Sequence, residues 1–286
     1  MDMTRKEAEE LVQRHEISSL PINPMELADK EDVMVMPMPS SGPGGVSGML
    51  QRHSGVYNGV HAESFGILYA THVDNAGFQR FSVAHELGHL FLPGHQEAMR
   101  QGILPPSRAE FSSKDRYERE ADSFASNLLM PVRLFDKQMR TAGEGLEAIR
   151  ALREACCTSL TATAIRYVER TSDLAAIVLS ENGIIKYANA SRFFKEYPGI
   201  RFPMSGSVLP SPDVRSFCSE QHRTRHALSS EKHVEVSDWF DSVLNGELLE
   251  QCVGLGGWRR TLTVISALDF PMIDELDEST DRGVSW

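Results

Sequence analysis

The chain has 286 residues, which suggests one large domain or two of ordinary size, with enough length to bury a hydrophobic core. Hydrophobic residues make up 41% and charged residues 24% of the sequence, as is typical of a soluble globular protein. The formal net charge of -11 argues against a surface built mainly to neutralise phosphates, although it leaves room for a small basic patch.

The sequence has no feature that is typical of a secreted or membrane protein. Its first residues, MDMTRKEAEELVQRHE, are charged from the second position and lack the apolar region of a signal peptide. The longest apolar run, Leu174–Leu179, is too short to span a bilayer. The four cysteines show no CxxC spacing, so we expect a cytoplasmic protein with reduced thiols.

The first half of the chain predicts helices mixed with short strands. In chain order we expect a helix over 4–16, a short helix from Pro24, a strand over 32–38, a loop over 40–48, short strands up to His72, a helix over 80–92, an irregular segment over 95–113 and a helix over 114–130. Prolines end both long helices, since the first is followed by Pro93 and the second by Pro131.

The second half changes character near residue 171. Up to about Arg170 the pattern is helical, with a glycine-containing break over 142–145. A hairpin around Asn182–Gly183 then begins an alternating pattern. Later strands are expected in the segments HVEVSDWF, ELLEQCVGL and WRRTLTVISAL. We therefore predict an α+β protein with a boundary near 171–173.

The segment His85-Glu86-Leu87-Gly88-His89 has the spacing H-E-x-x-H on a predicted helix. Residues i and i+4 lie about 40° apart on one helix face, so both imidazoles can bind one ion. A catalytic zinc keeps one position for water and lowers the pKa of that water toward ~7, so that Glu86 can accept its proton. From the composition of the chain, roughly 0.03 matches to this spacing are expected by chance. The apolar neighbours of the motif indicate that the helix is buried, and buried histidines and a buried glutamate need polar partners or a metal.

Three residues are candidates for the third ligand. His95 lies ten residues after the first histidine, at the metzincin spacing, but Leu92 stands where that pattern has a glycine. On the next predicted helix Glu118 borders the buried apolar face, whereas Glu120 projects about 160° further round. Periodicity therefore favours Glu118, with Asp122 one turn on to orient a zinc histidine, and His95 and Glu120 remain alternatives.

The sequence RFSVAHELGHLFL followed by YEREADSFASNLLMP closely resembles the ImmA/IrrE metallopeptidases, which cleave helix-turn-helix repressors of the XRE type. The resemblance covers about residues 5–135 and includes the LPINPMELA turn. It implies a zincin-like domain, with His85, His89 and Glu118 as zinc ligands and Glu86 as general base. His95 has no counterpart in the family, and we expect it to be a solvent histidine or a contact near the mouth of the site.

Longer relatives such as IrrE carry a helical, helix-turn-helix-like segment and then a GAF-like sensory domain, which implies domains over 1–135, 136–172 and 173–286. The helical segment offers few basic side chains, so we expect it to brace the peptidase or dock a repressor, and we do not expect direct DNA binding. In the last part we expect aromatic residues to lie in the core and histidines to be exposed: Trp239, Trp258, Phe270, His222, His226 and His233.

The function predicted from the sequence is a zinc endopeptidase that cleaves an XRE-type repressor and so induces stress-response or mobile-element genes. The alternative is a regulatory protein that binds a repressor without cutting it, and the intact Glu86 argues against that reading. Manganese or iron also suits two histidines and a carboxylate. We expect Ser64–His72 to be a sheet edge that holds an extended substrate, and His61, His72 or Tyr69 to stabilise the oxyanion. The oligomeric state stays open.

Overall fold

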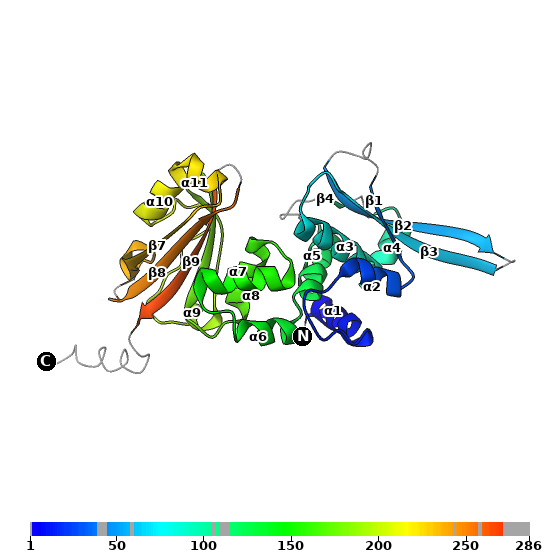
Figure 1. Cartoon of the computed structure of the whole chain (residues 1–286), viewed down its shortest axis with the longest axis horizontal. Helices are drawn as coiled ribbons and strands as arrows, with labels where there is room; N and C mark the ends of the chain where they lie inside the picture. The colour runs from blue at the N-terminus through cyan, green and yellow to red at the C-terminus, as the bar shows by residue number, and fades with distance from the viewer. Residues whose placement is uncertain are drawn as a thin grey trace. The chain divides into compact units, whose positions relative to one another are not determined.

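The fold is that of a computed structural model (Figure 1), and the residues described are 2–38, 45–57, 60–103, 107–108, 115–242, 244–256 and 259–270. Contacts between residues divide the chain into two compact units. Unit 1 comprises Met1–Thr141 and Ala151–Ser159, and unit 2 comprises Ala142–Arg150 and Leu160–Trp286. The predicted α+β class is confirmed, because each unit combines helices with its own sheet. Residues of the expected middle segment, 136–172, are divided between the two units.

Unit 1 contains helices and a four-stranded sheet. The helices are α1 (Met3–Arg14), α2 (Pro24–Lys30), α3 (Ala76–Phe91), α4 (His95–Arg100), α5 (Arg116–Leu129) and α6 (Val132–Met139). The strands are β1 (Met34–Pro37), β2 (Val46–Tyr57), β3 (Val60–Tyr69) and β4 (Ser107–Arg108). Helix α7 (Gly145–Cys156) has residues in both units.

The sheet of unit 1 has the order β1-β3-β2-β4. Strand β1 is parallel to β3, whereas β2 is antiparallel to both β3 and β4. Helix α3 lies against β2 and β3, and α5 packs on α3. The long β2–β3 hairpin extends beyond the helices, as Figure 1 shows in light blue. The helices and the sheet enclose a core of apolar side chains that includes Leu11, Leu27, Ile67, Leu87, Phe124 and Leu128.

Three expectations for unit 1 are corrected by the structure. The predicted edge Ser64–His72 is wrong for most of its strand residues, because Gly66–Tyr69 of β3 are paired on both sides, by β1 and by β2. The segment 95–113, expected to be irregular, contains α4 and β4. The motif helix starts at Ala76 and not at Arg80, because the Asn75 side chain caps it by accepting a hydrogen bond from the Phe78 backbone N–H at 2.9 Å.

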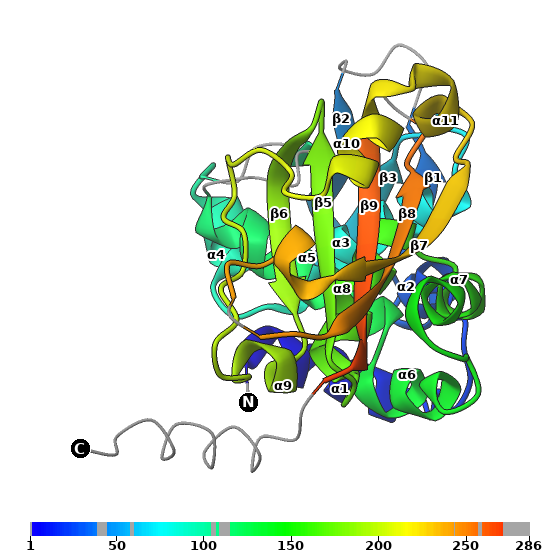
Figure 2. The same cartoon turned by 90° about the vertical axis from the view of Figure 1, so that its left-hand side faces the viewer.

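Unit 2 is built on a five-stranded antiparallel sheet of order β6-β5-β9-β8-β7, seen face on in Figure 2. Its elements are α8 (Leu160–Arg170), β5 (Ala175–Glu181), β6 (Ile184–Ala190), α9 (Arg192–Lys195), α10 (Pro212–Ser219), α11 (Gln221–Arg225), β7 (Ser229–Glu235), a 3₁₀ turn (Val236–Asp238), β8 (Glu247–Gly254) and β9 (Arg260–Asp269). The predicted hairpin is confirmed, since Asn182 and Gly183 join β5 to β6 with φ of 52° and 76°.

Elements of unit 2 pack against the strands of this sheet. Ala176 and Val178 of β5 belong to the core that includes α10, together with Phe194, Phe217, Trp239 and Phe240. Helix α8 packs against β5 and β6. The expected core position of Trp239 is confirmed by its 2% exposure, and the three histidines expected to be exposed are exposed. Trp258 lies outside the described residues.

Among the described residues, no helix is both long enough and apolar enough to cross a membrane.

Candidate metal centre

The candidate site lies where α3 meets α5. Gly88 stands at the contact: a Cβ added there would lie 3.1 Å from Cα of Ala121 and 3.3 Å from its carbonyl oxygen. The missing side chain at position 88 and the small one at 121 therefore let the two backbones approach closely. Helix α3 is buried continuously over Ser82–Leu90, so both motif histidines and Glu86 are inside the protein.

The two helices bring His85, His89 and Glu118 together as a buried group suited to a metal ion. His85 Nε2 lies 3.1 Å from His89 Nε2. The carboxylate oxygens of Glu118 lie 3.5 Å from His85 Nε2 and 3.4 Å from His89 Nε2. Asp115 caps α5 by accepting from the backbone N–H of Tyr117 and Glu118, which places Glu118 in the first helical turn.

These distances fit a metal ion. With ligand bonds of about 2.0–2.1 Å, neighbouring ligand atoms of a tetrahedral site are about 3.3–3.4 Å apart. The observed separations of 3.1, 3.4 and 3.5 Å lie around that value. Burial by itself raises the pKa of Glu118, but the hydrogen bonds from His85 and His89 outweigh it and lower that pKa to about 2. The carboxylate is therefore charged, as a ligand must be.

Asp122 lies one helical turn beyond Glu118 and contacts the other nitrogen of His85. Its Oδ1 is 2.8 Å from His85 Nδ1. Burial by itself lowers the pKa of His85, but the hydrogen bonds to Asp122 and Glu118 outweigh it and raise that pKa to about 10. Asp122 fixes the proton of His85 on Nδ1 and leaves Nε2 for the ion.

Glu86 is 1% exposed, and its Oε1 has no hydrogen-bond partner among the described residues. The carboxylate lies beneath Gly48 of β2, where an added Cβ would come within 2.6 Å of Oε1 and 3.0 Å of Cγ. A side chain at position 48 would force this carboxylate to move. No sequence pattern indicates Gly48, because its contact with Glu86 joins two segments that are far apart in the chain.

His95 is not a solvent histidine, which corrects that expectation, and it does not belong to the group of His85, His89 and Glu118. It is 0% exposed, and its Nδ1 lies 3.0 Å from Nδ1 of His89, the nitrogen that faces away from the cluster. Gly94, with φ of 84°, reverses the chain and begins α4, which brings His95 back toward α3. Glu120 is not a ligand either, because its Oε2 lies 3.2 Å from His95 Nε2.

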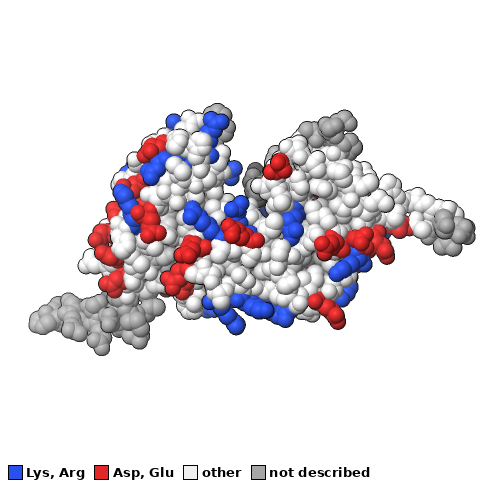
Figure 3. Space-filling model, in the orientation of Figure 1, with Lys and Arg blue, Asp and Glu red and all other residues white. Residues whose placement is uncertain are grey.

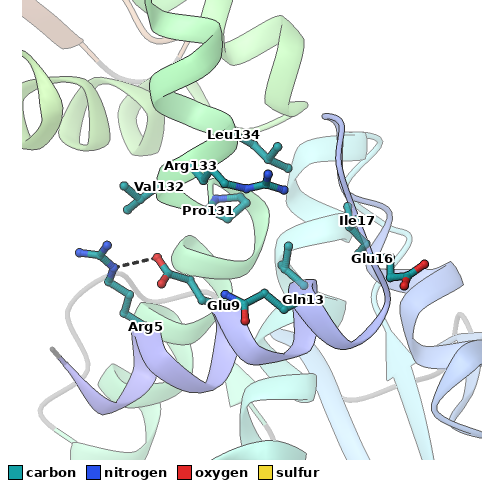
Figure 4. A pocket seen from close by; sticks show the side chains of 10 residues that line it. Arg5, Glu9, Gln13, Glu16, Ile17, Pro131, Val132, Arg133 and Leu134 are labelled. Atoms are coloured by element: carbon teal, nitrogen blue, oxygen red, sulfur yellow. Dashed lines mark hydrogen bonds and ion pairs between the residues drawn. The ribbon is translucent and has the colours of Figure 1, made fainter.

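The candidate oxyanion groups receive no support. His72 is exposed, Tyr69 is partly buried against the core of unit 1, and the side chain of His61 lies outside the described residues. A pocket of about 550 Å³ lies between α1 and the start of α6 (Figure 4). None of its lining residues belongs to the metal cluster: Arg5, Glu9, Val12, Gln13, Glu16, Ile17, Pro131, Val132, Arg133 and Leu134.

Comparison with known proteins agrees with this geometry. Residues 28–166 match the family model of the IrrE N-terminal-like domain, peptidase family M78. This part of the chain is an IrrE N-terminal-like domain. The family resemblance seen in the sequence is thereby confirmed, and the IrrE-like domain carries the His85, His89 and Glu118 cluster.

A solved structure described as a Mycobacterium tuberculosis transcriptional regulator is similar in fold. It superposes with a TM-score of 0.55 at 13% sequence identity, covering 93% of this chain and 77% of that one. At this identity the likeness establishes the fold alone, and its coverage of 93% of this chain extends it beyond the 28–166 segment. No curated protein matches the chain.

Proposed function

We propose that this protein is a metal-dependent endopeptidase that cleaves a helix-turn-helix repressor of the XRE type. The observation that carries the proposal is Glu86, a buried carboxylate whose Oε1 is unpaired among the described residues and whose neighbour in sequence is a candidate ligand. Burying an unpaired carboxylate is costly, so its presence indicates a catalytic use. A site that only held a metal for stability would have no need of it.

Zinc bound by His85, His89 and Glu118 would polarise the peptide carbonyl and acidify a water molecule, and manganese or iron suits the same ligands. Glu86 accepts the proton of the attacking water on its carboxylate and then returns it to the leaving amine. Asp122 holds the His85 ring in position through Nδ1. The burial of Glu86 keeps bulk water from competing for its lone pairs.

The substrate is proposed to bind along β2. Strand β4 pairs only with Val46 and Gly48, so among the described residues the outer edge of β2 is free from Met49 onward. That free edge begins next to Gly48, which lies against Glu86. An extended peptide added to this edge by backbone hydrogen bonds would run past the general base.

The choice of a repressor as substrate rests on the family resemblance. It is supported by the similar solved structure, which is described as a transcriptional regulator. Unit 2 is proposed to be a GAF-like sensory domain that controls the peptidase. Direct DNA binding is not part of the proposal: α8 packs on β5 and β6, and the face in Figure 3 carries acidic and basic side chains side by side.

The alternative is a regulator that binds a repressor without cleaving it. The decisive experiment incubates the zinc- or manganese-loaded protein with the XRE-type repressor encoded beside it, in parallel with Glu86→Gln and Glu118→Ala. We expect cleavage by the unaltered protein alone, with metal retained by Glu86→Gln and lost by Glu118→Ala. An intact repressor in every reaction, with stable binding to the unaltered protein, would establish the alternative.

A further inference from the structure

A chain of hydrogen bonds leads from the metal cluster to the protein surface through His95. His89 Nδ1 and His95 Nδ1 are 3.0 Å apart, and His95 Nε2 is 3.2 Å from Glu120 Oε2. Glu120 in turn accepts from Arg116 Nε at 2.8 Å, one helical turn away on α5. The ring of Tyr117 meets the His95 ring edge-on, with 4.9 Å between centroids. His95 is therefore fixed on several sides at once.

The positions of the ring protons follow from this geometry. Two nitrogens 3.0 Å apart can share only one proton, so one of the two Nδ1 atoms donates and the other accepts. His89 offers Nε2 to the metal cluster, so the proton of its neutral ring is on Nδ1. His95 Nδ1 is then the acceptor, and the proton of His95 is on Nε2, where Glu120 accepts it.

The two motif histidines are thus held in different ways. The Nδ1 atom of His85 contacts a carboxylate directly, Asp122 at 2.8 Å. The Nδ1 atom of His89 contacts the imidazole of His95, and the carboxylate of Glu120 contacts the other nitrogen of His95. The buried His95 ring therefore fills the place that a carboxylate fills for the other ligand.

We propose that His95 is a positioning residue, which holds the His89 ring in the tautomer and orientation that present Nε2 to the metal. The inference rests on the metal site of the proposed function and adds a residue to it. Outer partners of metal-binding histidines of this kind raise metal affinity by about 10–100-fold. Without His95, the N–H at Nδ1 of His89 is left unpaired in a buried place, and its ring is free to turn or to move its proton to Nε2.

The test compares His95→Ala with His95→Asn. An asparagine Oδ1 is as many bonds from Cα as a histidine Nδ1, so it can accept the hydrogen bond from His89. His15→Ala is the matched control, because His15 also contacts a carboxylate, Glu31 at 2.5 Å, but lies on the chain just after α1, away from the site. Glu120→Ala provides a second variant. The Glu120 side chain is partly exposed, so its removal does not open the core.

Zinc affinity is measured by competition with a chromophoric chelator, the Co²⁺ absorption spectrum reports ligand geometry, and the melting temperature of the metal-free protein reports folding. We expect His95→Ala to bind zinc about 10–100-fold more weakly with an altered Co²⁺ spectrum, Glu120→Ala to lose less, and His95→Asn to recover most of the affinity. His15→Ala should bind as the unaltered protein does.

Equal affinity of folded His95→Ala and the unaltered protein would overturn the inference, as would a His95→Asn protein as weak as His95→Ala. If His95→Ala does not fold, unchanged zinc affinity in Glu120→Ala overturns it. These outcomes differ from failure of the proposed function, in which the unaltered protein binds zinc and leaves every repressor intact.

Discussion

Replacement of Gly48 by alanine tests whether the position of the Glu86 carboxylate limits the reaction. The added Cβ would lie 2.6 Å from Oε1, 3.0 Å from Cγ and 3.2 Å from Cδ of Glu86. Ordinary contact with a Cβ begins at 3.4 Å, so the carboxylate must move by about 0.8 Å, the difference between 3.4 and 2.6. Position 48 is in a strand, where alanine is accepted without backbone strain.

A displacement of about 1 Å in a catalytic group costs up to about 10²-fold in rate. We therefore expect Gly48→Ala to lower kcat by about 10–100-fold, while zinc affinity and melting temperature stay unchanged, because no ligand is among the three atoms nearest to the new Cβ. Gly55→Ala is the matched control: it lies on the same strand, and its added Cβ meets nothing within 4 Å.

The assay is the rate of repressor cleavage at saturating substrate, with zinc content measured on the same samples. Wild-type kcat in Gly48→Ala would refute the reasoning, because it would show that Glu86 works equally well from a displaced position. Loss of zinc from Gly48→Ala would refute it in another way, since the change would then have reached the ligands and not the base alone.

Two further predictions concern the stability of each unit. Gly88→Val should lower the melting temperature and weaken zinc binding, because its side chain would separate α3 from Ala121 and draw Glu118 away from the histidines; unchanged values by calorimetry and chelator competition would contradict this. Burial raises the pKa of Glu250, although Trp239 donates a hydrogen bond to it at 2.7 Å. A raised pKa in the folded state makes the contribution of this group largest at low pH and lost as pH rises through that pKa. Glu250→Gln should therefore raise the melting temperature by a few degrees at pH 7 and by nothing below about pH 4, whereas equal gains at both pH values would show that the charge is not the cause.

Local patterns were enough to find the three candidate ligands. Spacing along one helix placed His85 and His89 on a common face, and the apolar face of a second helix turned Glu118 inward with Asp122 one turn behind it. Both inferences depend only on helix geometry, which is the same wherever the helix lies. The hairpin at Asn182–Gly183 was also predictable from local sequence, because its turn consists of these two residues.

The same local reasoning failed wherever a contact joined distant segments. Strand order cannot be read from alternation: the pattern predicts a sheet edge over Ser64–His72, yet β1 pairs with Gly66–Tyr69 of β3. No sequence motif marks Gly48. Its contact with the Glu86 carboxylate arises only because β2 crosses above Glu86.

The sequence by itself indicated the two helices and the His85, His89 and Glu118 group that the structure brings together, because helical periodicity is a property of each segment alone. Only the tertiary structure decided what His95 does. Its spacing from the motif is that of a ligand, yet the turn at Gly94 returns it to the outer nitrogen of His89 and not to the cluster. Sequence spacing gives only the number of residues between two side chains. Whether His95 can bind a metal or can only support its ligand depends on which side of the His89 ring it reaches, and that is set by the tertiary structure.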